Sequence, residues 1–85
     1  MPPTPDQVRQ YIADGLACEH IAVSSNDCVH FEALVVSSAF EGKRQVARHQ
    51  LVYATLGDRI KGSAAAIHAL ALTTRTPAEY AEDQR

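Results

Sequence analysis

Three side chains in this sequence are candidate metal ligands, and two of them lie close together in the chain. Cys28 and His30 are two residues apart, and His68 stands near the start of an apolar segment. In an extended segment, residues two apart project from the same side, so one metal could take either Cys28 or His30. A thiolate suits an iron–sulfur cluster, and imidazole ligation raises the potential of such a cluster. The Cys-x-His spacing alone is weak evidence, because a turn cysteine beside a surface histidine gives the same pattern.

The alternation of residues 67–74 predicts a strand, with His68 on one side of it together with Leu70 and Leu72. A lone histidine among leucines is more often a hydrogen-bonded structural residue than a metal ligand. The three candidates also form an incomplete set, because a four-ligand cluster needs further thiolates from outside the chain. Two interpretations of His68 therefore stay open, a structural histidine and part of a shared metal site.

Basic residues gather in one segment, although the formal net charge of the chain is −2. Lys43, Arg44 and Arg48 lie within residues 42–57, which contain no acidic residue. A solvated helix face is the commonest explanation of such a segment. The overall negative charge does not favour a nucleic-acid binder, since affinity for phosphates comes mainly from basic residues. These three residues are the candidate contacts of an alternative, DNA-binding function.

Common catalytic motifs are missing from the sequence. It has no Cys-x-x-Cys pair and no glycine-rich phosphate loop, and 85 residues leave little room for a deep substrate pocket. We therefore predict that the protein is not an enzyme. Its apolar runs are too short to span a bilayer, and its first residues do not resemble a secretory signal. We expect one cytoplasmic domain with reduced cysteines over residues 1–85, its core at about 5–83.

The same signature of a helix start occurs near both ends of the chain. Thr4-Pro5 and Thr76-Pro77 each pair a capping threonine with a proline at the first helical position, and Glu79 completes a capping box in the second case. Apolar residues at every fourth position from 8 to 16 predict that the first helix extends to about residue 17.

Between these helices we expect a β-hairpin, a second helix and a third strand. Residues 20–24 and 30–36 are predicted as the two strands of the hairpin, and residues 67–74 as the third strand. The second helix follows a turn at residues 40–43 and ends at Gly57, with residues 47, 51 and 54 on its apolar face, 52 and 56 beside them, and Arg44 and Arg48 on another face. The order α-β-β-α-β-α predicts an α+β sandwich, a three-stranded sheet with its helices packed on one face.

The stretch at residues 19–23 resembles the eukaryotic cytosolic branch of the BolA family. Four further segments, taken together in their order and approximate spacing, resemble the BolA family over nearly the whole chain. They are Phe40-Glu41-Gly42-Lys43, Arg48-His49-Gln50-Leu51-Val52, Ile67-His68-Ala69-Leu70 and Thr76-Pro77-Ala78-Glu79-Tyr80.

The resemblance implies a KH-like fold of the class II type and a partner, a monothiol glutaredoxin, with which family members bridge a [2Fe-2S] cluster. It implies His68 as one ligand, at the start of the third strand, and Cys28 or His30 as the other, in the loop of the hairpin. Glutathione would be a further ligand of the cluster, and no cofactor is expected in the isolated chain. Bacterial members have been described as DNA-binding regulators. KH domains clamp nucleic acid with a Gly-x-x-Gly loop, but residues 42–45 lack the second glycine.

We therefore expect an adaptor of iron–sulfur metabolism in the cytoplasm, with the nucleus as a second compartment. The alternative is a KH-like transcription regulator that contacts DNA through Lys43, Arg44 and Arg48.

Overall fold

The computed structural model describes residues 3–27, 30–57 and 69–85. Its elements follow in the order α1 (Pro5–Gly15), β1 (His20–Ser24), β2 (His30–Val36), the 3-10 helix η1 (Ser38–Phe40), α2 (Gln45–Leu56), β3 (Ala69–Arg75) and α3 (Pro77–Asp83). The predicted order of helices and strands is confirmed, and both strands of the hairpin have the predicted bounds. The predicted third strand began at residue 67, and residues 67 and 68 lie outside the described part of the chain.

The two predicted helix starts form by the same local mechanism. The Thr4 hydroxyl accepts a hydrogen bond from the Gln7 backbone N–H, while the Gln7 side chain accepts one from the Thr4 N–H at 2.9 Å. Thr76 and Glu79 repeat this reciprocal capping at the start of α3. Each box satisfies backbone donors that the first turn of a helix leaves unpaired.

The three strands form one mixed sheet with β2 in the centre. β1 pairs antiparallel with β2 through the hairpin, and β3 pairs with β2 in parallel. Parallel neighbours need a connection that returns the chain to the same end of the sheet, and α2 lies in that connection. The starts of β2 and β3 therefore lie side by side.

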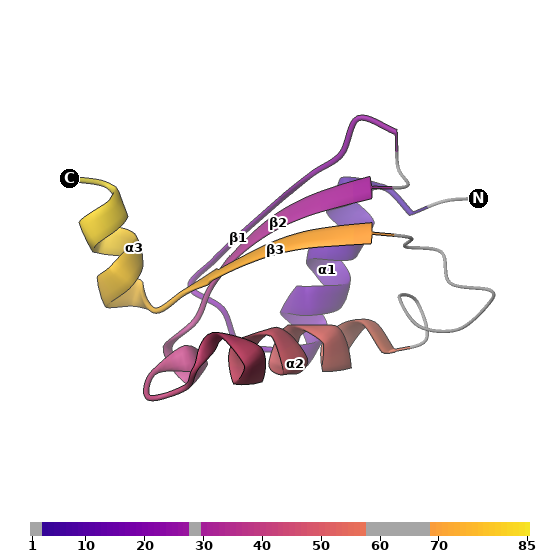
Figure 1. Ribbon diagram of the computed structural model, residues 1–85. Helices are drawn as coiled ribbons and strands as arrows, with labels where there is room; N and C mark the ends of the chain where they lie inside the picture. Colours follow the sequence, from indigo (N-terminus) through magenta and orange to yellow (C-terminus); the bar gives the residue numbers. More distant parts are fainter. Residues whose placement is uncertain (1–2, 28–29, 58–68) are drawn as a thin grey trace.

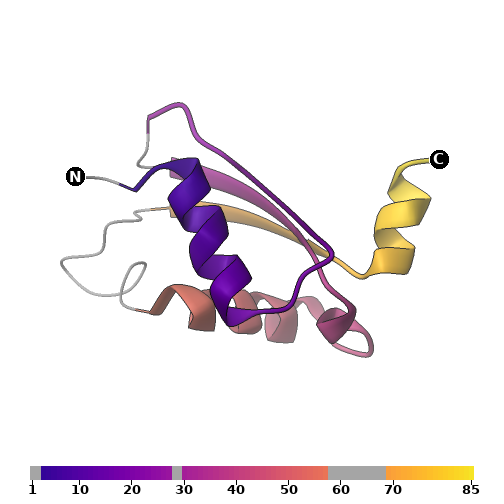
Figure 2. The same ribbon diagram turned by 180° about the vertical axis from the view of Figure 1, so that it is seen from behind.

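Helices α1 and α2 cover one face of the sheet, and α3 lies beyond the ends of the strands (Figure 1). Seen from behind, α1 crosses in front of the hairpin (Figure 2). The core lies between these two helices and the sheet, and its members are Val8, Ile12, Phe31, Ala33, Val35, Phe40, Val52 and Leu56. The predicted packing on one face thus holds for α1 and α2. In the described part of the chain, no helix is long and apolar enough to cross a membrane.

The prediction of which residues of α2 form the centre of its buried face is wrong. The buried row consists of Arg48, Val52 and Leu56, while Ala54 is exposed and Leu51 is only half-buried. Large aliphatic side chains spaced by four fill the core better than alanine does. The row can include Arg48 because its guanidinium forms an ion pair with Glu79 of α3.

Gly15, the last residue of α1, lies against Thr55 of α2. A Cβ atom at this position would lie 2.8 Å from Thr55 Cγ2 and 2.9 Å from Thr55 Cβ on α2. From its type alone, a glycine is expected to weaken the last turn of a helix. The structure adds a packing reason for the glycine at this position.

The contact between Gly15 and Thr55 can be tested by whether Gly15→Ala raises or lowers the free energy of unfolding. Helix propensity alone predicts that Gly15→Ala stabilises the protein by up to about 1 kcal/mol. We expect a loss of about 1–3 kcal/mol in the free energy of unfolding instead, because the added methyl group overpacks the contact with Thr55. Urea unfolding measures it, and a stabilised variant would contradict the close approach of α1 and α2.

Candidate functional site

The candidate metal ligands belong to the end of the sheet at which β2 and β3 begin. His30 is the first residue of β2, and its register partner on β3 is Ala69. Cys28 and His68 lie outside the described residues, so the structure places only one of the three candidates directly. The first described residues after positions 28 and 68 are close in sequence to these candidates: they are His30 and Ala69, which are register partners in the sheet.

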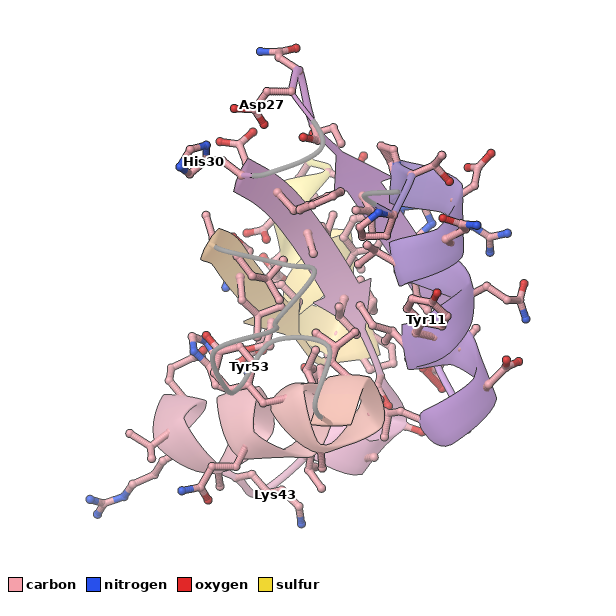
Figure 3. All side chains as sticks on the ribbon, turned by 90° about the vertical axis from the view of Figure 1, so that its right-hand side faces the viewer. Tyr11, Asp27, His30, Lys43 and Tyr53 are labelled. Carbon is pink, nitrogen blue, oxygen red and sulfur yellow. The ribbon has the colours of Figure 1, made fainter. Side chains whose placement is uncertain are left out.

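The His30 side chain projects into solvent and is held by a nearby carboxylate. It is 69% exposed, and its Nδ1 lies 2.9 Å from Asp27 Oδ2 (Figure 3). The other carboxylate oxygen of Asp27 accepts a hydrogen bond from the His30 backbone N–H, also at 2.9 Å. Asp27 therefore fixes both the start of the strand and the orientation of the ring.

This contact determines which ring nitrogen is free to bind a metal. An ionised carboxylate can only accept hydrogen bonds, so Nδ1 must carry the proton and donate a hydrogen bond to Asp27. In the neutral ring, Nε2 then keeps its lone pair. Metal-binding histidines commonly have this arrangement, in which the second nitrogen donates to a carboxylate that orients the ring.

The turn before β2 is tied together by a further side chain. The Ser25 hydroxyl lies 2.6 Å from the His30 carbonyl oxygen, to which it donates, and it also contacts Asp27 Oδ1 at 3.3 Å. Neither Ser25 nor Asp27 was among the candidate site residues predicted from the sequence. The signal available in the sequence was a carboxylate three residues before a candidate histidine.

Arg48 does not lie on an exposed helix face as the sequence predicted. It is buried on α2, its Nη1 lies 2.7 Å from Glu79 Oε1, and its Nε donates to the Lys43 carbonyl oxygen at 2.8 Å. The guanidinium also lies 6.0 Å from the centre of the Phe40 ring. Because α3 contributes the acidic partner, Arg48 links α2, the turn before it and α3.

The predicted basic patch is therefore smaller than expected. Lys43 and Arg44 are exposed at the start of α2, but the guanidinium of Arg48 is already engaged by protein atoms. Figure 3 places Lys43 at the opposite side of the molecule from His30. Two exposed cations are weaker support for DNA binding than the three that the sequence suggested.

The other chemically reactive side chains have structural surroundings. Cys18 is half-buried and its thiol donates to the Leu16 carbonyl oxygen at 3.3 Å. Burial, followed by the charge of Glu19, raises the pKa of this thiol, which disfavours the reactive thiolate. His20 stacks on the Tyr80 ring of α3 at a centroid distance of 5.2 Å. The His49 and Tyr53 rings are nearly perpendicular, with their centroids 6.3 Å apart.

Comparisons with known proteins agree with this architecture. The family model described as BolA-like protein matches residues 15–79. Human BolA-like protein 1 is 42% identical over 64 residues, which cover 75% of this chain and 44% of the human protein. The DNA-binding transcriptional regulator BolA of Vibrio cholerae is 49% identical over 51 residues, covering 60% of this chain and 45% of the relative. A crystal structure of a Bol-like protein from Babesia bovis has a TM-score of 0.82 and 26% identity, covering 100% of this chain and 98% of the other.

The class of protein is defined by the α+β fold with this order of helices and strands, and by a family model that matches most of the chain. The chain belongs to the BolA-like protein family, as the sequence motifs indicated. The chain spans less than half the length of the human relative that it matches.

The ion pair between Arg48 and Glu79 predicts a specific acid sensitivity. The hydrogen bond from Arg48, followed by that from the Thr76 backbone, lowers the pKa of Glu79 from 4.5 to about 2. A pKa that is lower in the folded protein contributes stability that is complete above pH 4.5 and is lost as the pH falls to about 2. We expect Glu79→Gln to lower the free energy of unfolding at neutral pH, and the gap to the wild type to close in acid.

Urea unfolding at a series of pH values measures this gap. Glu41→Gln is the matched control, since Glu41 is exposed and forms no ion pair with the described residues. A gap between wild type and Glu79→Gln that stays constant down to pH 2 would contradict the proposed strength of the ion pair.

Proposed function

We propose that this protein is an adaptor of iron–sulfur metabolism that binds a monothiol glutaredoxin and shares a [2Fe-2S] cluster with it. His68 and either Cys28 or His30 are the proposed ligands from this chain. The active-site cysteine of the glutaredoxin and the thiol of glutathione supply the other two. The cytoplasm is the proposed compartment, and the role is one of binding and not of catalysis.

One observation carries the proposal, the parallel pairing of β2 with β3. His30 is the register partner of Ala69, and Ala69 directly follows His68 in the sequence. His30, itself a candidate ligand, and Ala69, the sequence neighbour of His68, thus lie side by side at one end of the sheet. Residues far apart in the sequence can contribute to one coordination shell only if the fold brings their segments together in this way.

The chemistry of the described donor fits an iron–sulfur cluster. His30 has an outward-facing ring with Nε2 free for a metal and Nδ1 held by Asp27, and its exposure leaves room for a partner protein. Within residues 3–27, 30–57 and 69–85, no three His, Cys, Asp or Glu side chains are grouped closely enough to hold a metal ion. Two ligands are proposed from this chain, so the proposal leaves the other two of the four to the glutaredoxin and glutathione.

The spectrum of the cluster tests the proposal. Adding the protein to a cluster-loaded monothiol glutaredoxin should change the visible absorption and circular dichroism, because imidazole replaces a thiolate at one iron. The change should reverse in acid, since a ligating imidazole must be deprotonated. His68→Ala should abolish it.

His49→Ala is the control for loss of a histidine elsewhere, since that ring lies against Tyr53 on α2. A spectral change that survives in His68→Ala would exclude His68 as a ligand. Identical spectra before and after addition of the wild-type protein would reject cluster sharing altogether.

A second substitution distinguishes the two candidates for the other ligand. If His30 is the ligand, Asp27→Ala should weaken the cluster-bearing complex by about 10-fold, because loss of an orienting carboxylate typically costs 10- to 100-fold in metal affinity. If Cys28 is the ligand, Cys28→Ser should remove the spectral change and Asp27→Ala should have little effect. Titration of the dichroism signal measures both, with Asn26→Ala as a control in the same turn. Complexes of wild-type affinity in both variants would exclude this turn from the site.

A further inference from the structure

The face of the sheet opposite α1 and α2 is open in the described part of the chain. Alternation along the strands puts Phe31 and Ala33 of β2 in the core and turns Glu32 to the open side. Ala71 and Thr73 of β3 are likewise less buried than the threonine at position 74. Helix α3 lies beyond the strand ends, so it does not cover the middle of this face (Figure 1).

Glu32 lies at the centre of this open face with small neighbours on both sides. Its register partners are Ser24 on β1 and Ala71 on β3. Glu32 is exposed and forms no hydrogen bond or ion pair through its carboxylate with the described residues, whereas Glu19 and Glu79 each accept hydrogen bonds from protein groups. Two small flanking residues leave the carboxylate accessible from above the sheet.

Two hollows of about 380 and 490 Å³ adjoin each other on this face, because Ser24, Glu32 and Ala71 line both of them. The larger hollow extends to Asp27 and His30, and the smaller one continues in the other direction along the sheet. Together they form a groove, which we call the Glu32 groove. It runs from the candidate cluster ligand His30 along the open face of the sheet.

The charge of the Glu32 groove is negative. Asp27 and Glu32 line it, and neither hollow is lined by a described lysine or arginine. The cation at the end of β3, Arg75, is held by Asp83 at 2.9 Å. Lys43 lies at the opposite side of the molecule from His30, which lines the groove (Figure 3). A complementary ligand would therefore be cationic, and the open shape suits a protein segment better than a small molecule, whose sites are usually more enclosed.

We propose that the Glu32 groove is the docking surface for the glutaredoxin that shares the cluster, and that Glu32 pairs with a lysine or arginine of that partner. This inference rests on the proposed function, because the groove begins at the proposed cluster ligand. Such a charge pair favours the correct orientation of the two proteins and speeds their association.

Charge substitutions at position 32 test the docking surface, with cluster-free glutaredoxin as the probe. Glu32→Lys should weaken binding by about tenfold or more, because like charges would then face each other. Glu32→Gln should weaken it by about two- to fivefold and reduce its dependence on salt. Glu41→Lys has the same charge change on an exposed turn away from the groove and should bind as the wild type does. Calorimetric titration measures these affinities, and thermal unfolding checks that each variant is folded.

The outcomes separate this inference from the cluster proposal. Wild-type affinity in Glu32→Lys, with the cluster spectrum still changing on mixing, would overturn the docking surface and leave cluster sharing intact. Weaker binding in Glu32→Lys but not in Glu41→Lys would support the docking surface, even if no cluster spectrum changed. Self-association of the chain that depends on Glu32, or no binding of the glutaredoxin by the wild type, would also overturn it.

Discussion

The parallel pairing of β2 with β3 is the constraint on which the rest of the structure depends. A hairpin forms from neighbouring residues, but a parallel pair requires the chain to leave the sheet and return to the same end. Helix α2 lies in this return and buries Val52 and Leu56 against the sheet. The pairing that completes the core also sets His30 beside Ala69. Fold and candidate site are therefore consequences of one topological feature.

A second, polar link fixes the end of the chain. No residue of α3 is buried, so this helix cannot depend on an apolar face of its own. Its contacts are the ion pair of Glu79 with Arg48, that of Asp83 with Arg75, and the stack of Tyr80 on His20. Glu79 serves two purposes, since the same carboxylate caps α3 and neutralises a buried arginine.

Features determined by neighbouring residues could be predicted from the sequence. The threonine caps at Thr4 and Thr76 and the alternation of β1 and β2 involve residues only a few positions apart, and the structure confirms them. The orientation of α2 could not be predicted in this way. Arg48 is buried because Glu79, 31 positions later, meets its charge. The short contact at Gly15 likewise depends on Thr55, which no local pattern connects with it.

The candidate site was predictable in its residue types and not in its details. The spacing of Cys28 and His30 indicated a choice between two ligands, and the family motif singled out His68. The carboxylate of Asp27, which sets the proton on Nδ1 of His30, and the acidic groove along the open face of the sheet depend on geometry. Neither belongs to the motif by which the family was recognised.

The most direct measurement of the central claim is pulsed electron paramagnetic resonance on the reduced cluster complex. This protein would be labelled with nitrogen-15 in its histidines only, and the glutaredoxin left unlabelled. Ligation by His68 predicts a strong hyperfine coupling to nitrogen-15, which His68→Ala abolishes if Cys28 is the second ligand and reduces to the coupling of one histidine if His30 is. A reduced cluster coupled to no nitrogen-15, in a complex that has formed, would contradict the account.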